Sequence, residues 1–594
     1  MSHTQKPALL VISLQVQSSY QAVPLGAATI VSALRADPAV SARVSPELLE
    51  FTLEDARFRG RSPREIGSLV AREIASRLSR SDDSSPGANT ASPAARVPTI
   101  VGFSLYVWNR LALEAAAREL KTLVPSALTF AGGPEITANP FMPGESPFDR
   151  QILGEGETAS AAFVRSVLDP SRESPRGQSS RAPGADETRC PDEDAAFLPS
   201  PWLDGTLDGS EAVRTHRGAL WELARGCPYA CSYCYESKGS RKVRAIPLGR
   251  LERELDRFVE LGIERVFVLD PTYNASRERA LELLALIERR APGIHFNFEA
   301  RAELLDRATV AAFSRIPCSL QIGLQSSNPE ALKLVNRPAD LATFSKRIAL
   351  LNEAGVTFGL DLMYGLPGDS FSTFRASLDY ALALYPNNLE IFRLAVLPGT
   401  ALADRGKELG LEWEKEPPYN VRSTPKFSAQ DLARSASLAR ATDVFYTQGR
   451  AVTWFLSALA PLKLKPSQFL QDFAAYLEDA KASGAKGKRA HTAGECLTHR
   501  EAEGLQLAFL AAKYREKGKA YLSLLVENVV TLNGAWTRAL AEGEESVLEL
   551  AWHPEDLFSP ESLDLEYFQE NACMEGCRVR VFPTSDGPDY SVFS

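Results

Sequence analysis

Short apolar runs alternate with amphipathic stretches over the first part of the chain. The runs predict strands buried on both faces, and they lie at residues 8–13, 48–53, 99–104, 127–131 and 150–153. Segments 26–35, 63–78 and 109–123 between them carry apolar residues at helical spacing. Buried strands that alternate with helices are typical of a doubly wound parallel sheet. We therefore expect an α/β chain that begins with a Rossmann-like domain over residues 1–168.

A second alternation of strands and helices begins after residue 217. Helices are predicted at 248–261, 276–290, 301–315, 339–354 and 370–384, between strands at 220–224, 265–269, 295–299, 319–325, 357–364 and 389–397. Six such units predict a partial (β/α)6 TIM-type barrel over residues 206–420. Its chemistry is expected at the carboxyl ends of the strands.

The remaining segments have other patterns. Residues 429–446 and 505–531 have helical periodicity, and only 546–552 and 578–582 are strand-like, which predicts a mainly α-helical domain over 421–594. Two polar stretches rich in Ser, Pro, Gly and Asp cannot contribute to a core. We interpret them as an insertion at 81–97 and a linker at 169–205.

Composition narrows the possible partners. The formal net charge of −9 argues against a nucleic-acid partner, whose phosphates must be neutralised by basic residues. No apolar run is long enough to cross a membrane, and residues 1–7 lack the pattern of a secretion signal. We therefore expect a cytoplasmic protein that binds neither nucleic acid nor membrane.

Three of the eight cysteines are clustered directly after a predicted strand. Cys227, Cys231 and Cys234 lie in a loop shaped by Gly226 and Pro228. Structural zinc normally needs four ligands, and no fourth Cys or His lies nearby. Iron–sulfur clusters usually take four cysteines, so three leave one iron open to a small molecule. Buried structural thiols are the remaining alternative.

The spacing CxxxCxxC, with Tyr233 before the last cysteine, resembles the radical S-adenosylmethionine (radical SAM) superfamily. The resemblance implies that Cys227, Cys231 and Cys234 hold a [4Fe–4S] cluster. In that superfamily, S-adenosylmethionine binds the open iron, and one electron from the cluster breaks its C–S bond to give a 5′-deoxyadenosyl radical. The resemblance extends over about residues 218–402.

Later strand ends resemble the branch with coproporphyrinogen-III dehydrogenase-like and cobalamin-binding members. The similar motifs are at 298–301, 322–326, 328–337, 360–368 and 397–400. The resemblance implies that Tyr233, Glu299, Gln325, Arg337 and Asp361 contact S-adenosylmethionine. Arg337 suits the methionine carboxylate, because its planar fork bonds a carboxylate bidentately.

The second barrel strand departs from the family pattern. It runs Phe-Val-Leu-Asp-Pro-Thr-Tyr-Asn over 267–274 instead of ending in Gly-Gly-Glu. Asp270 or Thr272 is therefore expected to bind the methionine amino group. A structural turn is the alternative for each of these residues.

Four glycine-containing phrases follow successive strands of the first domain. Together they resemble the cobalamin-binding domain that is fused to many radical SAM enzymes. The resemblance implies cobalamin contacts at Pro24, Leu25, Gly26, Ser104, Tyr106, Trp108, Asn109, Gly132, Gly133, Pro134, Glu135, Gly154, Glu155, Gly156 and Glu157. The domain has no Asp-x-His-x-x-Gly motif, and its only histidine is His3, so we expect cobalt without a histidine ligand. A Rossmann-like domain that binds nothing is the alternative.

The resemblance implies methyl transfer to an unactivated carbon of a small-molecule or peptidic substrate, with an electron donor such as flavodoxin or ferredoxin. Alternatives are a radical rearrangement, a cobalamin-independent oxidoreductase and a non-enzymatic sensor. A methylthiotransferase would need cluster cysteines in its N-terminal domain, and none precedes Cys190. Cys573 and Cys577 lack further ligands, so we interpret them as unreactive thiols rather than a second metal site.

Overall fold

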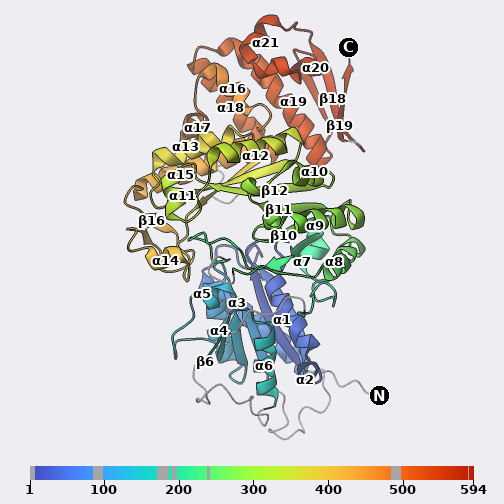
Figure 1. Cartoon of the computed structure of the whole chain (residues 1–594), viewed down its shortest axis with the longest axis vertical. Helices are drawn as coiled ribbons and strands as arrows, with labels where there is room; N and C mark the ends of the chain where they lie inside the picture. Colours follow the sequence, from blue (N-terminus) through green and yellow to red (C-terminus); the bar gives the residue numbers. More distant parts are fainter. Residues whose placement is uncertain are drawn as a thin grey trace.

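The computed structural model describes residues 7–83, 98–169, 186–189, 197–236, 241–482, 497–585 and 587–593. Three parts follow one another along the long axis in Figure 1: the N-terminal domain in blue, the barrel in green and yellow, and the C-terminal region in orange and red. His3, residues 84–97 of the predicted insertion and most of the predicted linker lie outside the described residues.

The N-terminal domain contains one parallel sheet in the order β2-β1-β3-β4-β5-β6. Its strands are β1 Ala8–Gln15, β2 Ser45–Thr52, β3 Ile100–Ser104, β4 Leu128–Gly132, β5 Arg150–Leu153 and β6 Asp186–Arg189. The last strand corrects the sequence interpretation, because β6 lies inside the stretch 169–205 that was predicted to be a linker. A short polar strand at a sheet edge lacks the apolar run on which the prediction depended.

Helices cover both faces of this sheet, which confirms the doubly wound arrangement. Alternate residues of β1 point to opposite sides. Leu10, Ile12 and Leu14 pack with α3 (Pro63–Asp83) and α4 (Arg110–Leu123). On the other face, Leu9 and Val11 pack with α1 (Leu25–Ala36) and α6 (Glu157–Leu168).

The second sheet is the predicted partial barrel. Six parallel strands follow in sequence order: β7 Gly218–Glu222, β10 Arg265–Leu269, β11 His295–Ala300, β12 Cys318–Gln325, β13 Thr357–Tyr364 and β14 Asn388–Arg393. The connecting helices include α8 Leu248–Glu260, α9 Arg277–Arg290, α10 Arg307–Phe313, α12 Leu341–Glu353 and α13 Phe371–Leu382. On β12, Leu320, Ile322 and Leu324 are buried. Residues between them, such as Gln321, face the barrel interior.

The C-terminal region is mainly helical, with α15 Ala429–Thr442, α17 Pro466–Ala482, α18 His499–Glu516 and α19 Ser523–Glu542. It ends in an antiparallel sheet of β17 Ser546–Leu550, β18 Cys577–Thr584 and β19 Gly587–Phe593. The predicted boundary at 420/421 divides a hairpin, because β15 Glu412–Trp413 pairs with β16 Val421–Ser423. The change to helix begins after this hairpin.

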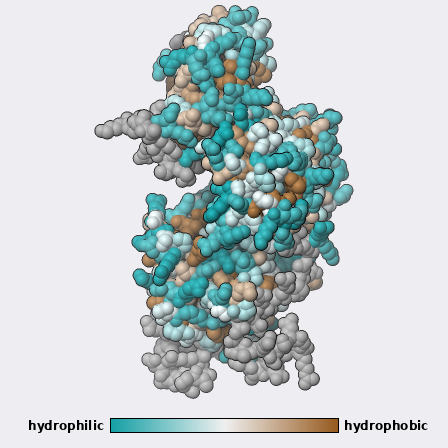
Figure 2. Space-filling model, turned by 90° about the vertical axis from the view of Figure 1, so that its left-hand side faces the viewer, coloured by the Kyte–Doolittle hydropathy of each residue, from teal (hydrophilic) through white to brown (hydrophobic). Residues whose placement is uncertain are grey.

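None of the described helices combines the length and apolar composition needed to cross a bilayer. On the face shown in Figure 2, hydrophilic residues predominate and hydrophobic residues form small patches.

Candidate active site

The cysteine loop follows β8 (Ala224–Arg225) at the carboxyl end of β7. Cys227 and Cys231 are buried, and Cys234 is half-buried. Backbone hydrogen bonds fix the loop to the barrel: Ser232 N donates to Val335 O at 2.9 Å, and Leu402 N donates to Ser232 O at 2.8 Å. The loop is therefore held at the mouth of the barrel, as the resemblance implies.

The thiols do not surround a single ion. Within the part of the chain that the structure describes, no group of three His, Cys, Asp or Glu side chains is arranged to hold one metal ion. A structural zinc ion needs its ligands to converge on one point. The cysteines of a cubane cluster each bind a different iron, so they lie further apart. The choice of an iron–sulfur cluster over zinc therefore rests on the resemblance of the cysteine motif.

Arg337 lies beside the cysteine loop. Its Nη1 donates to Sγ of Cys231 at 3.6 Å, and its Nη2 donates to the Gly323 carbonyl at 2.6 Å. A Cβ at Gly323 would lie 2.4 Å from Nε2 of Gln325 and 3.0 Å from Nη2 of Arg337. Glycine at 323 therefore makes room for both side chains.

Gln325 ends β12 with a φ of 67°, a left-handed conformation that is rare for a residue with a side chain. Such backbone strain clusters at ligand sites, where the surrounding structure must hold it in place. The conformation is consistent with the S-adenosylmethionine contact expected for Gln325.

Carboxylates gather inside the barrel. Part of Glu299 is exposed to solvent, although protein atoms surround most of its carboxyl group. Burial, followed by the charges of Asp361, Asp270, Glu390 and Glu236, raises its pKa to about 7. Burial also raises the pKa values of Asp361 and Asp270. Several acids that repel one another suit a cationic ligand, and S-adenosylmethionine carries a sulfonium and an ammonium group. The residues present therefore fit this ligand.

The turn after β10 separates the two residues that were predicted as alternatives. The hydroxyl of Thr272 is buried and donates to the Pro271 carbonyl at 2.7 Å. Oδ1 of Asp270 accepts from the Thr272 amide at 3.1 Å. Because the Thr272 hydroxyl already has a partner, Asp270 is the better candidate for the methionine amino group.

All four predicted cobalamin phrases lie at the carboxyl edge of the N-terminal sheet. Gly133 and Gly154 have φ values of 107° and 92°, which favour glycine. A Cβ at Gly26 would lie 2.5 Å from the Tyr106 hydroxyl oxygen. The rings of Tyr106 and Trp108 stack 4.5 Å apart. This edge therefore combines glycine turns with an aromatic pair at the strand ends, where doubly wound sheets bind ligands.

Several polar residues of these phrases contact protein instead. Asn109 donates to the Leu14 and Ser104 carbonyls, and it accepts from the Tyr106 amide, so it closes a turn. Nη1 of Arg110 donates to Oε1 of Glu135 at 3.0 Å. The side chains of Asn109 and Glu135 therefore have structural partners within the protein, and their predicted contacts with cobalamin stay a prediction.

The edge of the N-terminal sheet contacts the barrel mouth on two sides. Near β14, the Tyr419 hydroxyl donates to Glu135, and Nδ2 of Asn139 donates to the Tyr419 oxygen at 3.3 Å. Near β7, Nη2 of Arg225 donates to Oε1 of Glu157 at 2.7 Å, and Arg244 pairs with Glu155. The carboxyl edges of the two sheets therefore meet beside the cysteine loop.

A further contact lies at the amino ends of the barrel strands. Tyr20 follows β1, and its hydroxyl oxygen accepts from Nδ2 of Asn297 at 3.2 Å. The guanidinium carbon of Arg265 lies 5.6 Å from its ring centre. A Cβ at Gly218 would lie 2.4 Å from Cα of Tyr20, so glycine allows this close approach. The N-terminal domain therefore contacts the barrel near both ends of β7.

Sequence analysis missed these docking residues: Tyr20, Arg225, Arg244 and Tyr419. It also missed His216, whose Nε2 lies 2.8 Å from the Ser18 hydroxyl of the N-terminal domain. None of them belongs to a motif, because their partners are distant in the chain. The only sequence feature that could have pointed to one of these docking residues was the position of Arg225, two residues before Cys227.

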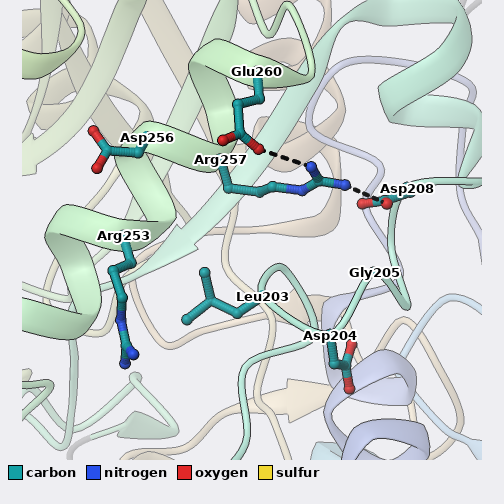
Figure 3. A pocket seen from close by; sticks show the side chains of 8 residues that line it. All are labelled: Leu203, Asp204, Gly205, Asp208, Arg253, Asp256, Arg257 and Glu260. Carbon is teal, nitrogen blue, oxygen red and sulfur yellow. Dashed lines mark hydrogen bonds and ion pairs between the residues drawn. The ribbon is translucent and has the colours of Figure 1, made fainter.

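Two surface cavities lie away from the predicted site residues. One, of about 610 Å³, is lined by Leu203, Asp204, Gly205, Asp208 and residues of α8. Figure 3 shows its Arg257 bridging Asp208 and Glu260. The other, of about 900 Å³, lies at the carboxyl end of β2 and includes Ser18 and Glu211. Neither contains a predicted site residue.

Comparison with known proteins defines the class of the barrel. Residues 221–381 match the model of the Radical SAM superfamily. This segment is therefore a radical SAM domain, and the predicted resemblance is confirmed.

Two curated relatives are similar to about half of the chain. One is a 2-(S-pantetheinyl)-carbapenam-3-carboxylate methyltransferase of Streptantibioticus cattleyicolor, 28% identical over 355 residues. The other is the cobalamin-dependent radical SAM methyltransferase TokK of Streptomyces tokunonensis, 28% identical over 353 residues. Each alignment covers 55% of this chain and 50% of the relative, so the chain spans about half the length of the curated relatives it matches.

A solved structure matches more of the fold. The cobalamin-dependent S-adenosylmethionine radical enzyme OxsB, with aqua-cobalamin bound, superposes with a TM-score of 0.53 and 13% identity. The match covers 88% of this chain and 82% of that chain. At this identity the match shows that the two chains share a fold.

Proposed function

We propose that this protein is a cobalamin-dependent radical SAM methyltransferase that methylates an unactivated carbon of a small-molecule or peptidic substrate. The observation that carries the proposal is the meeting of two carboxyl sheet edges beside the cysteine loop. Each edge is where its fold binds ligands. One ligand in the barrel and one on the N-terminal sheet would therefore face each other.

The chain's own residues supply complementary parts. Cys227, Cys231 and Cys234 would hold the [4Fe–4S] cluster, and Arg337 provides a cation for the carboxylate of S-adenosylmethionine. Glu299 and Asp361 provide negative charge for its cationic groups. When bound, the cofactors supply radical formation and a transferable methyl group.

The domain contacts serve to enclose this region. Buried ion pairs and the Tyr419–Glu135 hydrogen bond join the two edges on both sides of the loop. Exclusion of water protects a reactive radical from side reactions. An external electron donor such as flavodoxin or ferredoxin, a cytoplasmic location and the absence of a nucleic-acid partner belong to the same proposal.

The relatives support methyl transfer over the alternatives, since the two matched curated proteins are methyltransferases. A cobalamin-independent oxidoreductase would not need the glycine turns at the N-terminal edge. A radical rearrangement would use the same cofactors and is distinguished only by its product.

The test is anaerobic purification of the full chain with reconstituted cluster and cobalamin, followed by incubation with methyl-deuterated S-adenosylmethionine and cell extract. We expect the absorbance of bound cobalamin and a small molecule or peptide that carries the label. Cys227→Ala is the control and should give no labelled product. Bound cobalamin with an unlabelled, isomerised product would favour rearrangement, and absence of cobalamin would favour the oxidoreductase.

A further inference from the structure

The segment just before the first cluster cysteine is part of an ion-pair network between two domains. Arg225 lies two residues before Cys227 and is 15% exposed. Its Nε donates to Glu222 at 3.0 Å within the barrel. Its Nη2 donates to Glu157 at 2.7 Å, across the domain boundary. One guanidinium therefore joins the end of β7 to the N-terminal domain.

A second arginine strengthens the same contact. Arg225 on β8 pairs in register with Arg244 on β9 (Arg244–Ala245). Nη1 of Arg244 donates to Oε2 of Glu155 at 3.0 Å. Nη1 of Arg225 lies 3.3 Å from the same oxygen. The two arginines thus hold both acids of the Gly-Glu-Gly-Glu turn, residues 154–157.

The ion pair between Arg225 and Glu157 is costly to break. Arg225 forms ion pairs with Glu222 at 3.0 Å, Glu157 at 2.7 Å and Glu155 at 3.3 Å. Glu157 is only 5% exposed, and a buried acid without its cationic partner is strongly unfavourable. Arginine forms two directed bonds at once, which a lysine ammonium cannot copy.

We infer that Arg225 is a positioning residue: it sets the start of the cysteine loop against the 154–157 turn, and so fixes the separation of the cluster from the ligand on the N-terminal sheet. The identity of that ligand as cobalamin rests on the proposed function. The ion pairs between Arg225 and the 154–157 turn do not themselves require cobalamin.

The first test uses the full chain with reconstituted cluster and no cobalamin. Arg225→Gln removes the link from the barrel side and Glu157→Gln from the N-terminal side. Both should speed hydrogen exchange of the peptide covering residues 222–236 by about tenfold or more, since each removes a charged hydrogen bond. The double variant should exchange no faster than the faster single variant. Unchanged exchange of this peptide in Glu157→Gln would overturn the inference.

Two further variants distinguish positioning from general stability. Arg225→Lys keeps the charge but should recover only part of the protection. Arg290→Gln breaks an ion pair with Glu252 between α8 and α9, outside the domain contact, and should leave the peptide unchanged. If Arg225→Gln does not fold, Glu157→Gln and Arg225→Lys still decide the outcome.

The second test measures geometry in protein loaded with cobalamin. Pulsed electron paramagnetic resonance between Co(II) and the reduced cluster should give one narrow distance distribution in the wild type and a broader one in Glu157→Gln. Equal distributions would refute the positioning role. Failure of the wild type to bind cobalamin would instead contradict the proposed function, while the exchange result would still stand.

Discussion

The guanidinium of Arg337 lies against the thiol of Cys231, with Nη1 3.6 Å from Sγ, although 106 residues separate them in the chain. The same side chain donates to the Gly323 carbonyl from its other terminal nitrogen. Arg337 is therefore fixed between β12 and the cysteine loop. We expect a cation at this point to bind a carboxylate held beside the cysteine loop.

Arg337→Lys should weaken binding of S-adenosylmethionine by about tenfold or more, because lysine keeps the charge but loses the two directed bonds. Titration of cluster-reconstituted protein measures the dissociation constant. Lys333→Arg on nearby α11 (Pro329–Leu334) is the control and should bind normally. An unchanged constant in Arg337→Lys would assign Arg337 to a structural role.

Each cysteine of the loop should be essential for the cluster. Cys227→Ala, Cys231→Ala and Cys234→Ala should abolish the iron–sulfur absorbance and the formation of 5′-deoxyadenosine. Cys573→Ala, which alters an exposed thiol, should retain both. Full cleavage activity in any of the three loop variants would exclude that cysteine as a ligand.

The affinity for S-adenosylmethionine should depend on the ionisation of Glu299. Its pKa is raised to about 7 by burial and by neighbouring acids. A cationic ligand prefers the ionised form, so affinity should rise with pH through 7. Below that pH the affinity should fall by up to about tenfold per unit.

Glu299→Gln should flatten this pH profile, and Glu278→Gln on the outer helix α9 should preserve it.

The ionisation of Glu299 should affect the stability of the fold in the opposite direction to the affinity, so stability falls as pH rises. A carboxyl whose pKa is raised in the folded state binds protons more tightly there, so without ligand its contribution to stability is lost as pH rises from about 4.5 to about 7. Glu299→Gln should remove that loss in thermal unfolding. A wild-type affinity independent of pH would contradict the assignment.

The cobalt of bound cobalamin should lack a protein nitrogen ligand. No histidine occurs in the sequence between residues 7 and 169, and His216 contacts Ser18. We therefore expect the benzimidazole to be detached and no imidazole to replace it, which changes the electronic state of the cobalt. Electron paramagnetic resonance of the Co(II) form tests this, because a coordinated nitrogen splits the cobalt lines. Nitrogen splitting would refute the prediction.

Tyr419→Phe should loosen the domain contact near β14. It removes the hydroxyl that donates to Glu135, a residue only 5% exposed. The cost should be about 1–3 kcal/mol in the free energy of unfolding. Denaturant unfolding of the cluster-free protein measures it, and Tyr567→Phe, at an exposed tyrosine, is the control. Equal stability of the two variants would show that the hydrogen bond contributes nothing.

The sequence predicted those features that depend on local patterns. Buried strands such as β1 appear as continuous apolar runs. The spacing of Cys227, Cys231 and Cys234 itself indicates that the three thiols share one site. Glycine positions such as Gly133 follow from turns that only glycine adopts easily. Strand β6 and the hairpin at 412–423 were missed, because short edge strands have no distinctive periodicity.

What only the tertiary structure decided is which polar residues bind side chains of another domain. Glu135, Glu155 and Glu157 occupy positions where the resemblance implies cofactor contacts, yet Tyr419, Arg225 and Arg244 bind them. The sequence around a carboxylate is the same whether it contacts a cofactor or another domain. Its partner is set by the docking of two sheets, through side chains distant in the chain, and no spacing along the sequence records that contact.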